Sequence, residues 1–224
     1  VTMTMEVMKE FGVEVIRETA NRYSVKRPQR YEGKKYRIEG DVSSASYFFL
    51  AAALCRGRVR VRNINAQTLQ GDIKLLPIME RLGCGVVRGD HWIEVAGGEL
   101  TPGEHIFDLG DMPDMVPTLS VLAAIRPGRT IIKNVSHLRK KESNRLEALV
   151  TELRKTGVRA EERDDGIMIN GGRPHGAEIE TYNDHRIAMS FAILGLRTPG
   201  IKIKDKNCVN KSFPGFWEEL EKLY

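Results

Sequence analysis

Several features are scarce in this 224-residue sequence, and each absence disfavours a class of protein. Aromatic residues make up only 7% of the chain, and no RNA-recognition, KH or helix-turn-helix motif is present. A nucleic-acid-binding module, which the net charge of +5 would otherwise allow, is therefore disfavoured. The three cysteines, Cys55, Cys84 and Cys208, have no CxxC or other metal-ligand spacing. They predict a reduced, cytoplasmic protein, and no metal site is expected.

Long apolar runs and a signal peptide are also missing. The most apolar stretch, "SASYFFLAAALC", stops at Arg56 and is too short to span a membrane, so we expect no membrane partner. Hydrophobic residues still make up 41% of the chain, enough for a sizeable core. The first residue is Val1, and the letters that follow read as a helix already under way. We therefore expect a piece of a longer chain.

A repeat of about seventy residues runs through the sequence. Gly12, Gly83 and Gly157 each end an amphipathic helix and precede a strand, and they are 71 and 74 residues apart. Glycine suits the left-handed conformation in which many helices end. Apolar helices that follow an acidic residue recur with the same period, each followed by a strand such as "GRVRVRNI". A few packed subdomains are therefore expected rather than a solenoid.

The repeating unit has the predicted order strand–helix–strand–helix–strand–strand, which makes an α/β (α+β) fold. The first helix of each unit is apolar almost all round and must be buried, whereas the strands alternate and have one wet face. Helices at the centre and sheets outside are expected. We divide the chain into a tail of helix plus hairpin (1–35), two full units (36–105 and 106–176), and a last unit lacking its hairpin (177–224).

A charged loop, "HLRKKESNRLEAL" at 137–149, opens the second helix of one unit. Ser143 or Asn144 is a candidate cap for this helix. Lys141 and Arg145 are four residues apart, so on one helix they would share a face at its positive N-terminal end. Cations are unfavourable there without an anion, which indicates an anion site. A solvated charged loop is an equally good interpretation of the spacing alone.

The stretch "YNDHRIAMSF" at 182–191 combines a helix start with polar side chains. Asp184 is expected to cap the helix, and Arg186 lies in its first turn, again the wrong sign for a helix start. His185 fits a packing role at least as well as a catalytic one. The repeat maps Asp114, in "MPDMVP", onto the same helix start, where a cap is the simpler interpretation.

The loops opening the second helices carry further candidates. The repeat places Glu142 and Lys211 in equivalent loops of two units, although Lys211 alone is typical of an ordinary surface lysine. Equivalent ends of repeated units tend to converge on one side of a domain. Carboxylates beside several cations there suit acid–base chemistry on a polyanion.

Four motifs, "EGDVSSASYFFLAAAL", "RKKESNRL", "YNDHRIAMSF" and "KSFPGFWEEL", resemble in order and spacing the 5-enolpyruvylshikimate-3-phosphate synthase family. The resemblance runs along the whole chain but covers only the C-terminal half of that family. It implies an enolpyruvyl-transferase, inside-out α/β fold with two domains of three units each and a cleft between them. Residues 1–35 would then complete the last repeat of the other domain.

The resemblance also implies an activity, transfer of the enolpyruvyl group of phosphoenolpyruvate to the 5-hydroxyl of shikimate 3-phosphate without a cofactor. Asp114 would orient the shikimate hydroxyls and take the 5-hydroxyl proton. Lys141 would bind shikimate 3-phosphate, and Glu142 would transfer the proton at the phosphoenolpyruvate methylene. The residues that would hold phosphoenolpyruvate are Arg145, Arg186 and Lys211. The chain alone is expected to have little activity.

The sequence departs from the family in places. Asn144 stands where an aspartate is common, and no role is carried over to His137. A UDP-sugar enolpyruvyl transferase of the same fold is the alternative, although "NDHR" and "RKKESNR" favour the shikimate enzyme. The full-length enzyme is expected to be a monomer. The predicted hairpin within 13–28 would either fold back onto the last unit or pair with a second copy, so the chain alone can self-associate.

Overall fold

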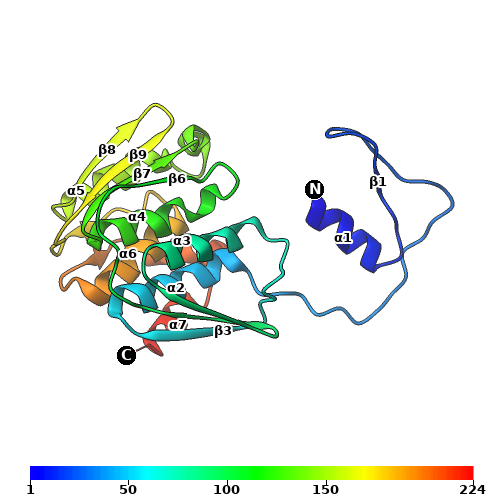
Figure 1. Ribbon diagram of the computed structural model, residues 1–224, viewed down its shortest axis with the longest axis horizontal. Coiled ribbons are helices and arrows are strands. Elements are labelled where there is room, and N and C mark those ends of the chain that lie inside the picture. The colour runs from blue at the N-terminus through cyan, green and yellow to red at the C-terminus, as the bar shows by residue number, and fades with distance from the viewer. Residues whose placement is uncertain (224) are drawn as a thin grey trace.

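The computed structural model describes residues 1–223 and has two visibly separate parts (Figure 1). The first part holds α1 (Thr2–Glu10) and a short antiparallel hairpin of β1 (Ile16–Arg17) and β2 (Tyr23–Ser24). No residue of α1 is buried. An extended linker then leads to the body of the molecule, which begins with α2. The expected helix and hairpin are thus present in the N-terminal segment.

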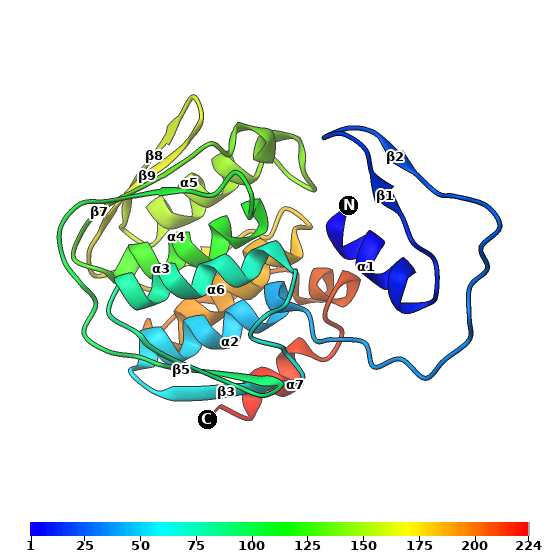
Figure 2. The same ribbon diagram turned by 45° about the vertical axis from the view of Figure 1, so that its right-hand side comes forward.

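Three helices form the centre of the body: α2 (Val42–Cys55), α4 (Val116–Ile125) and α6 (His185–Arg197). They pack against one another at the centre of the body (Figure 2), and most of their side chains are buried. Their sequences are apolar almost all round, so little of their surface could be left to water. The prediction of buried helices at the centre is confirmed.

A four-stranded sheet in the order β6-β7-β9-β8 covers one side of these helices. Its strands are β6 (His105–Asp108), β7 (Gly128–Lys133), β9 (Gly166–Gly171) and β8 (Arg159–Arg163). Only β6 and β7 are parallel, because α4 makes the crossover between them. With α5 (Arg145–Lys155), this region has the element order predicted for a complete unit.

The preceding unit is one strand short of the prediction. It contains β3 (Arg58–Arg62), α3 (Leu75–Arg81), β4 (Gly85–Gly89) and β5 (Trp92–Ala96), in a sheet of order β3-β5-β4. Residues 36–40, where a strand was expected, form none. The Glu39 carboxylate instead accepts hydrogen bonds from Asn65 N and Thr68 Oγ1, so side-chain contacts replace a backbone ladder.

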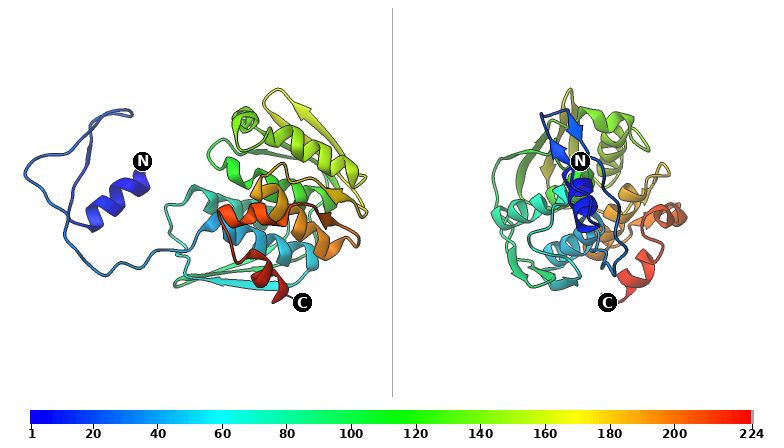
Figure 3. Two further views of the ribbon diagram at one scale, coloured as in Figure 1. Left: turned by 180° about the vertical axis from the view of Figure 1, so that it is seen from behind. Right: turned by 90° about the vertical axis from the view of Figure 1, so that its right-hand side faces the viewer.

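The last unit has a parallel pair, β10 (Glu178–Ile179) with β11 (Lys202–Ile203), followed by α7 (Phe216–Glu221). The hairpin β1–β2 does not fold back onto it. Figure 3 shows the hairpin well away from α6 and α7, and β1 pairs only with β2. The fold-back alternative is therefore wrong for this structure, whereas self-association of the chain stays a prediction. Across residues 1–223, no helix combines the length and apolar character needed to cross a membrane.

Candidate active site

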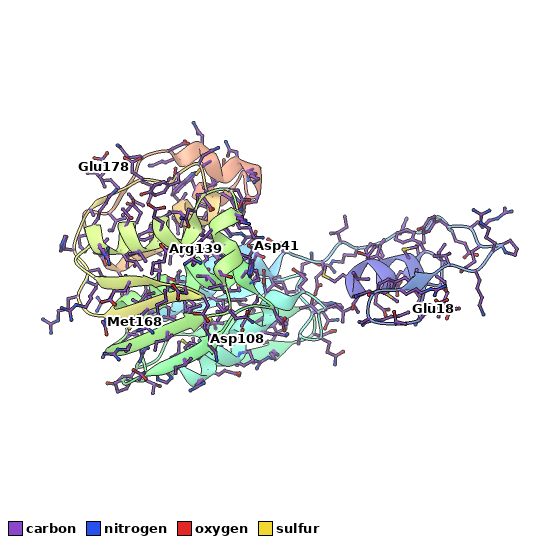
Figure 4. All side chains as sticks on the ribbon, turned by 90° about the horizontal axis from the view of Figure 1, so that it is seen from above. Glu18, Asp41, Asp108, Arg139, Met168 and Glu178 are labelled. Carbon is purple, nitrogen blue, oxygen red and sulfur yellow. The ribbon has the colours of Figure 1, made fainter. Side chains whose placement is uncertain are left out.

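The three central helices all begin at the end of the body that faces the N-terminal segment, near Asp41 in Figure 4. Asp41 caps α2 by accepting hydrogen bonds from Ser43 N and Ser44 N. Asp184 caps α6 in the same way through Arg186 N, at 2.9 Å. The predicted cap at Asp184 is therefore confirmed, and Asp41 caps α2 in the same way.

Asp114 stands at the third helix start but caps nothing. It lies in the short 3-10 turn η2 (Pro113–Met115), and no side chain caps α4. Prolines in the first turn lack the N–H groups that a cap would satisfy, so the carboxylate is not needed there. Its two oxygens instead accept hydrogen bonds from Arg145 Nη1 at 3.1 Å and from Arg186 Nη2 at 2.9 Å. The cap interpretation of Asp114 is wrong, and its carboxylate joins two helices.

Arg145 lies at the centre of a cluster of three carboxylates, and its environment differs more from the prediction than that of any other candidate residue. Its side chain is fully buried, and its nitrogens donate to the carboxylates of Asp114, Glu142 and Asp184. The bonds to Glu142 and Asp184 are 2.8 and 2.9 Å long, and a second bond to Asp184 is 3.3 Å. Because the guanidinium is buried and bonded to three carboxylates, it has no exposed N–H group to offer to phosphoenolpyruvate. The resemblance had implied that Arg145 contacts that substrate.

Glu142 and Lys211 approach each other from two different units. Lys211 Nζ donates to Glu142 Oε1 at 2.7 Å, while the other oxygen of Glu142 accepts from Arg145. The hydrogen bond from Lys211 is the largest of the causes that lower the pKa of Glu142 to about 2. Glu142 is therefore ionised at neutral pH.

Lys141 is not on a helix at all. Asn144 caps α5 through Glu147 N, so the helix begins at Arg145, and Lys141 lies in the preceding turn. The prediction that Lys141 and Arg145 share a helix face is wrong for this reason. Lys141 is exposed and makes no ion pair with any of residues 1–223. Its ammonium group is available to an anion.

The two histidines near the site differ in exposure. His185 is buried, burial lowers its pKa, and its Nδ1 has no hydrogen-bond partner within the described chain. Its imidazole is thus held neutral beside Arg186. His137 is exposed on the 3-10 turn before α5. It makes no hydrogen bond or ion pair with Asp114, Glu142 or Asp184.

Two side chains that the sequence patterns did not indicate also belong to this end of the body. Asp72, in the 3-10 turn η1 (Gly71–Lys74), accepts a hydrogen bond from Ser43 Oγ, and burial raises its pKa. Tyr47 is buried on α2 beside Arg186, and burial raises its pKa to about 12. The repeat could have found Asp72, because its loop is equivalent to the loops of Glu142 and Lys211.

These features match one protein family along nearly the whole chain. The family profile described as EPSP synthase (3-phosphoshikimate 1-carboxyvinyltransferase) matches residues 1–220. The chain belongs to the EPSP synthase family. The UDP-sugar and nucleic-acid alternatives find no support in the comparisons.

Individual relatives agree with this assignment. The chain is 46% identical over 223 residues to the 3-phosphoshikimate 1-carboxyvinyltransferase of Trichormus variabilis, covering 100% of this chain and 52% of the relative. It is 47% identical to that of Syntrophobacter fumaroxidans, covering 53% of it. EPSP synthase of Acinetobacter baumannii superposes with a TM-score of 0.85 at 29% identity, over 98% of this chain and 53% of that structure. The chain thus spans about half the length of the relatives it matches, and the fold is the α/β fold of that enzyme.

Proposed function

We propose that this end of the body forms one side of an active site that transfers the enolpyruvyl group of phosphoenolpyruvate to shikimate 3-phosphate. The observation that carries the proposal is the contact of Glu142 with Lys211 and of Asp114 with Arg186. Both reactants are polyanions, and each carboxylate lies against a cation that could hold one of them. A bound substrate anion can take over the cation from each pair. The carboxylate then lies next to the substrate and can transfer protons to or from it.

Asp114 is the proposed base for the 5-hydroxyl of shikimate 3-phosphate. The carboxylate is only partly buried, and its two arginine partners fix its position. Proton removal makes the oxygen a better nucleophile toward the central carbon of phosphoenolpyruvate. Lys141 is the proposed phosphate ligand for shikimate 3-phosphate, since it is exposed beside the cluster and unpaired within the described residues.

Glu142 is the proposed proton donor and acceptor at the phosphoenolpyruvate methylene. Adding the hydroxyl oxygen to the central carbon requires a proton on the methylene carbon, and eliminating phosphate removes one again. A carboxyl whose pKa is about 2 cannot donate that proton at neutral pH. The phosphoenolpyruvate anion would draw Lys211 away and place negative charge beside Glu142, and both effects raise the pKa of Glu142 and favour its protonated form.

Arg145 is proposed as the residue that positions the three carboxylates rather than as the main substrate clamp. Its guanidinium fixes Asp114 and Glu142 relative to each other from a fully buried position. Arg186 and Lys211, which are 15% and 57% exposed, remain as the proposed contacts to phosphoenolpyruvate.

The proposed reaction is tested by phosphate release from a chimera. In it, the part of the Trichormus variabilis relative that this chain does not match precedes residues 1–224. Phosphate release by the chimera should require both substrates, and the 224-residue chain alone should show negligible release, since single positioned donors can be worth about 10²–10³ in rate. Release without shikimate 3-phosphate, or none from the folded chimera, would count against the proposal.

A reducing compartment such as the cytoplasm is proposed for the protein. The sulfur atoms of Cys55, Cys84 and Cys208 are all unpaired, and two of these residues are buried. Reduced cysteines of this kind are typical of cytoplasmic proteins.

A further inference from the structure

A cavity of about 530 Å³ lies at the opposite end of the body from the candidate active site. The last residues of α2, α4 and α6 form part of its wall, together with the segments that follow β5 and β9. Because α2 spans 14 residues at about 1.5 Å per residue, the two ends are roughly 20 Å apart. No residue proposed for enolpyruvyl transfer lines this cavity.

Three arginines line the cavity, and one acidic residue faces them. Arg56, Arg173 and Arg197 are all exposed, and their guanidinium groups make no ion pair and no hydrogen bond within residues 1–223. The acidic residue is Glu99, which is likewise exposed and unpaired among these residues. Elsewhere on the body, arginines such as Arg58, Arg88 and Arg139 do have carboxylate partners.

A fourth arginine lies behind the cavity wall. Arg126 is fully buried between Ile125 and Pro127, which both line the cavity. Its nitrogens donate only to neutral oxygens, the carbonyls of Thr101, Gly103, Pro127 and Arg129 and the hydroxyl of Thr130. A guanidinium stays charged in proteins, so Arg126 adds a positive charge that no carboxylate neutralises.

The helix ends offset only part of this positive charge. Each helix C-terminus carries about −0.5 charge, so arginines at such ends are favourable to some extent without any ligand. The three ends and Glu99 together supply about two and a half negative charges. Four guanidinium groups exceed them, and three of the four have free donor groups directed to a concave surface.

We propose that this cavity binds one small multivalent anion that carries phosphate or carboxylate groups. Arginine pairs both groups with two parallel hydrogen bonds, so the shared chemistry is a compact anion with at least two negative charges. The concave shape favours a small molecule over a flat polyanionic surface. Binding here is independent of the proposed enolpyruvyl transfer.

Pyrophosphate and citrate serve as the two probes, measured by titration calorimetry on the full chain at low salt. Lys141→Ala, Arg186→Ala and Lys211→Ala are first introduced together, so that anion binding at the candidate active site does not contribute heat. We expect one pyrophosphate or one citrate per chain, and the tighter of the two probes identifies phosphate or carboxylate as the preferred group.

The test variant in that background is Arg56→Asn with Arg173→Gln and Arg197→Gln. Asparagine suits the left-handed conformation of Arg56, whose φ is 52°, so the charge is removed without backbone strain. Binding should weaken at least tenfold, and Arg173→Gln alone should weaken it by a few fold. The matched control is Arg159→Gln, an exposed and unpaired arginine on β8 outside the cavity, which should change affinity less than twofold.

Absence of binding by both probes at millimolar concentration would overturn the proposal. So would equal affinity of the test and control variants. If the triple variant does not fold, the single variant Arg173→Gln, which changes only a loop residue, decides between the same outcomes.

Discussion

Lys211 and Glu142 are joined by a 2.7 Å ion pair that links the loop before α7 to the loop before α5. The two residues are 69 positions apart in the sequence. One is a cation that an anionic substrate can attract, and the other is a carboxylate whose pKa depends on that cation. Arrival of an anion at Lys211 and protonation of Glu142 are therefore coupled.

The pKa of Glu142 should rise when Lys211 is removed. In the wild-type chain, a carbon-detected NMR titration of the Glu142 carboxyl should give a pKa of about 2. In Lys211→Met the pKa should rise toward the ordinary value of 4.5, although Arg145 still lowers it. Lys202→Met, which removes an exposed and unpaired lysine of β11, is the control. A Glu142 pKa that stays near 2 without Lys211 would show that the pair does not set it.

The same pair should make stability depend on pH. A carboxyl with a lowered pKa in the folded state stabilises above its unfolded pKa, and this contribution disappears as pH falls through the folded value. Glu142 and Lys211 are 27% and 57% exposed, so solvent screening limits the effect to about 1 kcal/mol. Lys211→Met should therefore be less stable than wild type to urea at pH 7, and the difference should shrink as pH falls from about 4.5 toward 2.

Arg145→Met should destabilise the fold by about 3–5 kcal/mol, measured by urea unfolding at pH 7. The substitution leaves Asp184, whose side chain is fully buried, without its counter-charge. Arg145→Lys should not restore the loss, because one ammonium group cannot reach three carboxylates in the geometry of a guanidinium. Lys141→Ala, which changes an exposed residue next to Glu142 in the same loop, should change stability by less than about 0.5 kcal/mol.

Arg186→Ala and Lys211→Ala, made in the chimera, should each raise the KM for phosphoenolpyruvate about tenfold or more. Removal of an anion ligand weakens substrate binding more than it alters the chemical step. The KM for shikimate 3-phosphate should change much less. Steady-state phosphate release at varied concentrations of each substrate measures both values, and an unchanged phosphoenolpyruvate KM in both variants would exclude them as its ligands.

Amides of the N-terminal segment should exchange hydrogen faster than those of the body. α1 buries no side chain, and the hairpin is held by only two residue pairs, Ile16 with Ser24 and Arg17 with Tyr23. Few contacts mean a low free energy of local opening. Exchange measured by mass spectrometry on the 224-residue chain should reach completion in 2–25 while α4 remains protected. Protection of 13–25 at a level that rises with protein concentration would instead support pairing of two copies.

The sequence predicted what depends on local chemistry. Apolar helices that must be buried, the cap at Asp184 and the hairpin strands follow from hydrophobic periodicity and hydrogen-bonding preference, and the structure contains them. The repeat also predicted that Glu142 and Lys211 occupy equivalent loops, and the structure brings the two side chains into contact.

Long-range contacts could not be predicted in this way. Spacing placed Lys141 and Arg145 on one helix, but Asn144 caps that helix, so it begins at Arg145 and Lys141 lies in the loop before it. Burial of Arg145 among three carboxylates depends on where three helices meet, which a charge pattern does not contain. The absence of a strand at 36–40 could not be predicted either, because it depends on a tertiary contact. The Glu39 side chain accepts a hydrogen bond from Asn65 N, in the loop after β3.

Turnover by the chimera with Glu142→Gln tests the central claim most directly. Glutamine keeps the shape and can still accept a hydrogen bond from Lys211, but it cannot transfer a proton. Phosphate release at saturating shikimate 3-phosphate and phosphoenolpyruvate should fall by about 10² or more, within the range of general acid–base catalysis, with both KM values within a few fold of wild type. Release at the wild-type rate would contradict the assignment of Glu142 as the proton-transfer group.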